Sequence, residues 1–96
     1  MTKASAFPPM RKYYMKILKN YFYQNIIQTR SDLKLTQEQM AETLAMDVRS
    51  FMNLDHGKTG CSALTLSLYL IYYCEDVPKF LSDLKAEFES EDNDIA

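Results

Sequence analysis

Apolar residues recur every three or four positions along most of this chain, the spacing that places them on one face of a helix. Polar and charged residues fill the intervening positions, as expected for helices with one buried face. Short interruptions that contain Pro, Gly, Ser or Asp separate the periodic stretches. The pattern therefore predicts five helices, at about residues 10–33, 36–44, 47–57, 62–73 and 76–88.

The first predicted helix is long, at about 20 residues or about 30 Å. It begins near Met10, after Pro8 and Pro9, and ends near residues 31–34. Residues 1–9 are predicted to be disordered. The apolar face consists of Tyr13, Tyr14, Ile17, Leu18, Tyr21, Phe22, Ile26 and Ile27, and the opposite face carries Arg11, Lys12, Lys16, Lys19 and Asn20. These aromatic residues are expected in the core or an interface rather than in a base-stacking platform.

The second and third predicted helices are short and adjacent. Thr36 is a good N-cap, and Gln39, three residues later, can close a capping box. Residues 45–46 make a turn, and Asp47 caps the next helix. Gly57 ends that helix at a position suited to positive φ. Two helices joined in this way form the helix–turn–helix unit, which in DNA-binding proteins places its second helix in the major groove.

The fourth predicted helix follows Ser62, which is a suitable N-cap. It is apolar almost all round, so we expect it at the centre of the core. A strand is rejected, although alternate leucines would fit one, because a lone strand has no partner in this chain. The residues expected in the core are Leu64, Leu66, Leu68, Leu70 and Ile71.

The fifth predicted helix is capped by Asp76 and has Pro78 in its first turn, where proline is tolerated. Residues 89–96 form an acidic tail. One domain is thus predicted over residues 10–88, with the helix–turn–helix motif at 36–57. The apolar stripe of the fifth helix consists of Val77, Phe80, Leu81, Leu84 and Phe88.

The motif TQEQMAETLAMDVRSFMNLDHGK, at residues 36–58, resembles the Cro/repressor-type (XRE-like) helix–turn–helix family. The resemblance extends from Arg30 to about Tyr73 and implies a compact all-α five-helix bundle of the lambda-repressor-like kind. The family's first helix is usually shorter, so here the N-terminal helix is extended. The patterned positions are held by Thr36, Gln37, Met40, Ala41, Met46, Asp47, Phe51, Asp55, Gly57 and Lys58.

The resemblance implies that the outward face of the third helix contacts DNA bases. Arginine pairs with guanine through two hydrogen bonds, asparagine pairs with adenine, and valine contacts the thymine methyl group. The alternative is a solvated face, which every surface helix has. The residues implied in base contact are Val48, Arg49, Ser50, Met52 and Asn53.

Three further residues match the family's phosphate contacts. Gln37 opens the first motif helix, and Lys58 and Thr59 follow Gly57. The alternatives are first-turn capping for Gln37 and a solvated loop charge for Lys58.

The family also implies an ion pair between Arg30 and Asp55, which would tie the first helix to the third and mainly fix their geometry. Two independent surface charges are the alternative. Ala45 and Lys34 stand where the family prefers glycine, so either a non-glycine residue adopts the left-handed region there or the turn is built differently. Asp47 places a negative charge beside the expected DNA.

The net charge of −2 conceals an uneven distribution. Residues 1–35 hold seven Lys or Arg and one acid, a balance of +6, whereas residues 36–96 hold four bases and twelve acids, a balance of −8. Four of these acids lie in the tail. Without them the chain carries +2, so the net charge understates what the surface can offer a phosphate backbone.

The sequence does not predict an enzyme, a cofactor or a metal. His56, Cys61 and Cys74 match no zinc spacing and form no argued nucleophile. Two cysteines do not indicate a disulfide framework, the N-terminus lacks a signal-peptide core, and no run of about 18 apolar residues marks a membrane span. A cytoplasmic protein without a membrane partner is expected.

The predicted function is sequence-specific binding of double-stranded DNA by a small bacterial or phage-type transcriptional regulator. The alternative is a protein–protein interaction module on the same fold with weak or no DNA affinity. A homodimer is also predicted, through the N-terminal extension, the fifth helix or both, because a small body cannot bury all their apolar residues. In the competing arrangement the extension folds back on its own bundle and leaves a monomer.

Overall fold

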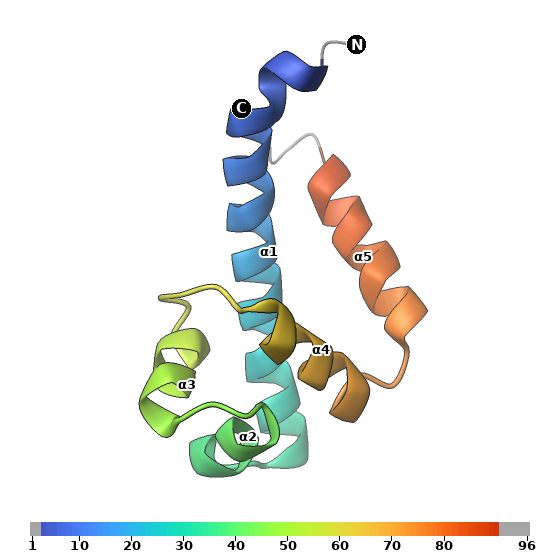
Figure 1. Cartoon of the computed structure of the whole chain (residues 1–96). Helices are drawn as coiled ribbons and strands as arrows, with labels where there is room; N and C mark the ends of the chain where they lie inside the picture. The colour runs from blue at the N-terminus through green and yellow to red at the C-terminus, as the bar shows by residue number, and fades with distance from the viewer. Residues whose placement is uncertain (1–2, 91–96) are drawn as a thin grey trace.

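The computed structural model describes residues 3–90 of the chain, with side chains from Met10 onward. Over these residues the secondary structure is entirely helical, which confirms the predicted all-α class (Figure 1). The helices are α1 (Lys3–Leu33), α2 (Gln37–Thr43), α3 (Val48–Asp55), α4 (Ala63–Tyr72) and α5 (Val77–Glu89).

The long helix α1 organises the bundle (Figure 1). Its C-terminal half packs with α3, which in turn packs with α2, and its N-terminal half runs beside α5. The shorter α4 crosses between these two groups and leads into α5. This arrangement leaves α3 at one side of the molecule, where one of its faces is open to solvent.

The predicted N-caps are all present. The Thr36 hydroxyl accepts the Gln39 amide at 3.0 Å, and the Gln39 side chain accepts the Thr36 amide at 2.8 Å, so the capping box is closed at both ends. Asp47, Ser62 and Asp76 each accept the backbone amide three residues later. These local hydrogen bonds satisfy amides that have no partner within the helix.

Three helices end in the same way, with one residue in the left-handed region. Lys34, Ala45 and Gly57 have φ values of 54°, 57° and 71°. After each helix two backbone amides return to carbonyls of its last turn, which is the Schellman arrangement. Lys34 and Ala45 therefore follow the first of the two alternatives that the sequence left open, a non-glycine residue in the left-handed region.

The core lies where α1, α2, α3, α4 and α5 meet. Phe22 of α1 contacts Tyr69 of α4 edge-to-face, with ring centroids 5.2 Å apart. Both rings are buried, so this pair joins the long helix to the crossing helix. The buried cluster consists of Phe22, Ile26, Met40, Ala41, Leu44, Phe51, Leu54, Tyr69 and Phe80.

The prediction that α4 forms the centre of the core is wrong for two of its residues. Leu64 and Ile71 are 60% and 68% exposed, and neighbouring Tyr72 is 64% exposed. The helix instead buries Thr65 and Tyr69. Because α4 lies across one side of α1, its opposite side is open to solvent (Figure 1). Leu66, Leu68 and Leu70 are half-buried.

The N-terminal boundary also needs correction. The sequence predicted disorder over residues 1–9, but α1 already begins at Lys3 and includes Pro8 and Pro9. Each proline has a φ near the helical value, but each also removes one backbone donor and crowds the carbonyl of the preceding turn. Residues 1–2 lie outside the described residues. At the other end Glu89 closes α5, and residues 91–96 of the predicted acidic tail also lie outside them.

The extension packs on α5 of its own chain. The rings of Tyr14 and Phe88 have centroids 4.8 Å apart, and the Tyr13 hydroxyl donates to the Ser90 carbonyl at 3.4 Å. Two turns further along α1, the Tyr21 hydroxyl donates to the Phe80 carbonyl at 3.1 Å. The aromatic residues that the sequence assigned to a dimer interface therefore make contacts within the bundle.

Candidate nucleic-acid interface

The two faces of α3 differ sharply in burial. Phe51, Leu54 and Asp55 are buried against the bundle. Of the five residues predicted to contact bases, Arg49, Ser50 and Met52 are exposed and Asn53 is half-buried, whereas Val48 is half-buried and packs against the buried cluster. The structure thus gathers the predicted base-contacting residues on one short helix with an open side.

Both ends of α3 are held by local hydrogen bonds. At its start the Asp47 carboxylate accepts the Ser50 amide at 2.8 Å, and this bond lowers the pKa of Asp47 below its ordinary value. At its end the Lys58 amide donates to the Asn53 carbonyl at 2.8 Å, and the Gly57 amide donates to the Leu54 carbonyl at 3.0 Å. The outward residues therefore sit on a short but well-terminated helix.

Asp55 joins three helices through its carboxylate. Arg30 of α1 approaches it with two nitrogens, at 3.1 and 3.4 Å, which confirms the predicted ion pair. The side-chain amide of Gln37, in α2, donates to the same carboxylate at 3.1 Å. The Asp55 side chain is 4% exposed and that of Arg30 is 33% exposed, so the acid is buried and the base half-buried. This network fixes how α3 sits on the rest of the bundle.

The contact of Gln37 with Asp55 was not anticipated from the sequence. The sequence offered two roles for the Gln37 side chain, a phosphate contact or capping of the first turn. In the structure this side chain donates to the buried Asp55 carboxylate instead. The two residues lie 18 positions apart, and no local pattern links them. A phosphate contact by Gln37 stays a prediction.

Lys58 and Thr59 are exposed in the loop between α3 and α4, as their predicted role requires. This loop passes close to α1. A Cβ on Gly57 would lie 3.3 Å from the Tyr23 ring, and a Cβ on Gly60 would lie 4.0 Å from the Cβ of Lys19. The loop is therefore held against the middle of the long helix.

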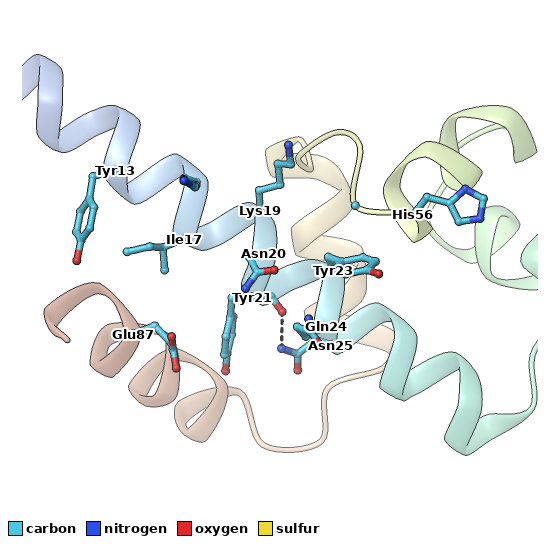
Figure 2. Close-up of a pocket in the computed structure, with 12 residues that line it drawn as sticks. Tyr13, Ile17, Lys19, Asn20, Tyr21, Tyr23, Gln24, Asn25, His56 and Glu87 are labelled. Carbon is cyan, nitrogen blue, oxygen red and sulfur yellow. Dashed lines mark hydrogen bonds between the residues drawn. The ribbon is translucent and has the colours of Figure 1, made fainter. Parts of the chain in front are cut away.

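An open groove of about 800 Å³ lies along α1, between the end of α3 and α5 (Figure 2). Lys16 and Lys19 of α1 line it, together with His56 at the end of α3. Glu87 of α5 is the acid among its lining residues. His56 was not among the predicted site residues, although its spacing of three from Asn53 and seven from Arg49 could have placed it on their side of the helix.

Within residues 3–90, no group of three or more His, Cys, Asp and Glu residues has the arrangement needed to hold a metal ion. Cys61 and Cys74 are both free thiols, and burial raises the pKa of Cys61. In the same part of the chain, no helix has the length and apolar character needed to cross a membrane.

No family model, curated protein or solved structure matches this chain. Its class is therefore defined by its fold, a small all-α bundle of five helices over the described residues. The candidate site is defined by the open face of α3 and the exposed loop that follows it.

Proposed function

We propose that this protein binds double-stranded DNA in a sequence-specific manner, as a small transcriptional regulator of the bacterial or phage type. The observation that carries the proposal is the open face of α3. Arg49 is exposed there and Asn53 is half-buried, on a helix anchored to the bundle through Asp55. Such a helix suits the major groove, which admits an α-helix and presents a distinct pattern for each base pair.

The side chains on this face supply the chemistry of base recognition. The Arg49 guanidinium can donate two parallel hydrogen bonds to guanine, and the Asn53 amide can pair with adenine. Val48 and Met52 offer apolar contact to a thymine methyl group. Lys58 and Thr59, one turn beyond the helix, would contact phosphates and set its position in the groove.

A selection from a random pool of duplexes at low salt tests the proposal. We expect enrichment of one sequence pattern by the unmodified chain. Arg49→Ala should cost about 1–3 kcal/mol on that pattern and relax preference at one base position. Arg49→Lys is the matched control, because it keeps the charge but lacks the rigid planar fork of the guanidinium. It should weaken the base preference and keep the salt dependence. A pool with no enriched sequence would contradict the proposal.

The alternative function is a protein-interaction module on the same fold. One observation favours it: Leu64, Ile71 and Tyr72 of α4 are each at least 60% exposed, and contiguous exposed apolar surface often marks a binding site. The predominance of acidic residues after residue 35 also favours this reading. Loss of a binding partner on Ile71→Ser, together with an unenriched DNA pool, would support the alternative.

We also propose that the protein acts as a homodimer. Two-fold dimers are the commonest oligomers, and helix–turn–helix readers often bind paired half-sites about 34–36 Å apart. The contacts of Tyr14 and Phe88 within the chain move the proposed interface away from the extension. The exposed apolar side of α4 takes its place.

A further inference from the structure

We propose that α1 extends the DNA interface. In this inference Lys12, Lys16 and Lys19 form a lysine row that contacts phosphates of the duplex flanking the bases that face α3. The inference rests on the proposed function of α3 and names a second surface for the same partner. It assigns a role to the N-terminal extension, whose charged side has no part in the core.

The lysine row lies on one side of α1. Residues 12, 16 and 19 are spaced at i, i+4 and i+7, which brings them onto the same face of a helix. Tyr23 continues this face one turn later. Its ring lies 3.3 Å from the place a Cβ would occupy on Gly57, directly after α3. The side of α1 that carries the lysines is therefore the side that meets the end of α3.

The row is continuous with the face of α3. Lys19 lies beside Gly60, two residues after Lys58, and it lines the same groove as His56. Figure 2 shows Lys19 and Tyr23 next to the loop that leaves α3, with His56 at the end of that helix. Lys58 of this loop and Lys19 of α1 thus carry positive charge at the end of α3.

Few anionic groups oppose this surface. Lys12 and Lys16 are exposed and Lys19 is half-buried. Arg30 pairs with Asp55 and Lys79 pairs with Asp83, and neither of these ion pairs involves the row. Glu87, on α5, is the acid that lines the groove. A polyanion is therefore the partner that this surface fits best.

The length of the row matches a phosphate backbone. Seven residues of helix rise about 10 Å. Each strand of B-DNA carries a phosphate every 3.4 Å or so along the axis, so the row faces roughly three phosphates. An anionic bilayer fits less well, because Asn20 and Gln24 line the neighbouring groove, whereas a membrane-bound helix presents a large apolar face beside its lysines.

The salt dependence of binding to a random-sequence duplex tests the row without relying on base recognition by α3. The test compares the unmodified full chain with the triple variant Lys12→Gln/Lys16→Gln/Lys19→Gln. The matched single variants are Lys16→Gln and Lys85→Gln. Lys16 and Lys85 are both exposed helical lysines, but Lys85 lies about 200° around α5 from Glu87, outside the groove.

We expect the slope of log K against log salt to become less negative by about 2–3 in the triple variant and by about 1 in Lys16→Gln. Lys85→Gln should leave the slope unchanged. The sequence pattern selected from a random pool should be the same for the triple variant as for the unmodified chain. If the half-buried Lys19 proves necessary for folding, the double variant at the exposed Lys12 and Lys16 should still change the slope by about 2.

The outcomes separate this inference from the proposed function. An enriched sequence with an unchanged slope in the triple variant overturns the lysine row and leaves recognition by α3 intact. A changed slope without any enriched sequence keeps the row and removes the sequence-specific function. Binding to phosphatidylserine vesicles that the triple variant loses, with no change of slope on DNA, assigns the row to a membrane surface and overturns the inference.

Discussion

At the scale of single residues, Asp55 is the most connected polar group of the described chain. Its carboxylate is almost fully buried and accepts hydrogen bonds from Arg30 and Gln37, which belong to different helices. A buried charge is costly unless it is paired and hydrogen-bonded. The two partners do not carry equal weight, because Arg30 is one-third exposed and can still reach water when its partner is lost.

Removal of Arg30 should therefore destabilise the fold more than removal of the acid. Arg30→Met leaves the buried carboxylate with Gln37 as its remaining side-chain partner, and we expect a loss of about 3 kcal/mol in the free energy of unfolding. Asp55→Asn, which leaves Arg30 to be solvated, should cost about 1–2 kcal/mol. Urea unfolding followed by far-UV circular dichroism at neutral pH measures both. Equal losses below about 1 kcal/mol would show that the pair behaves as surface charges.

Asp47 should make the stability of the protein depend on pH in the acidic range. The hydrogen bond from the Ser50 amide lowers the pKa of the folded-state carboxyl below its ordinary value of 3.8. Its stabilisation is therefore present above that ordinary value and is lost as pH falls through the lower folded-state pKa. Asp47→Asn keeps a capping oxygen but does not titrate. The difference in melting temperature between the unmodified protein and Asp47→Asn should shrink below about pH 4. A constant difference between pH 7 and pH 3 would contradict this origin.

At the scale of the elements, the helix ends decide how α1, α2 and α3 follow one another. Each ends in a left-handed residue, and only at Gly57 is that residue a glycine. A side chain in this conformation costs roughly 1–2 kcal/mol, whereas a glycine loses more chain entropy on folding, by about 0.5–1 kcal/mol. The turn between α2 and α3 is thus built with local strain that the surrounding packing compensates.

Ala45→Gly should relieve that strain. We expect the free energy of unfolding to rise by about 0.5–1 kcal/mol, because the gain at positive φ exceeds the entropy cost of glycine. Ala86→Gly is the matched control, since Ala86 is an exposed alanine inside α5 and its replacement should cost about 1 kcal/mol. Thermal unfolding of both variants measures whether each substitution raises or lowers the free energy of unfolding. Destabilisation of similar size in both would mean that the turn stores no strain at Ala45.

At the scale of the whole molecule, the exposed apolar side of α4 is the feature that a monomer leaves unexplained. Leu64, Ile71 and Tyr72 lie on it and are the most exposed large apolar residues of the described chain. Positions 64, 71 and 72 share one face of a helix, at i, i+7 and i+8. A second copy of the chain that meets this face would bury all three.

Sedimentation equilibrium from micromolar concentration upward measures this association. We expect the average mass of the unmodified protein to rise toward that of a dimer. Ile71→Ser should remain a monomer over the same range, because it removes the most exposed large apolar side chain of the α4 face. Tyr14→Ser, which breaks a contact within the chain, should lower stability and leave the association unchanged. A single monomer mass for the unmodified protein at all concentrations would exclude the homodimer.

The sequence alone determined the features that depend on near neighbours. The caps at Thr36, Asp47, Ser62 and Asp76 all close within three residues, so their spacing is visible in the chain itself. The helical period follows from the same short range, and with it the all-α class. The pairing of Arg30 with Asp55 was foreseen through a family resemblance and not through any local pattern.

Only the tertiary structure decided which side of each element is buried and which distant groups meet. Because α4 is apolar almost all round, its sequence does not indicate which side is buried. The way α4 crosses α1 decides this and leaves Leu64 exposed to solvent. The donation from Gln37 to Asp55 and the approach of Lys19 to the loop after α3 also join residues far apart in sequence. Such contacts depend on how whole helices pack, because the side chains themselves are equally compatible with several neighbours.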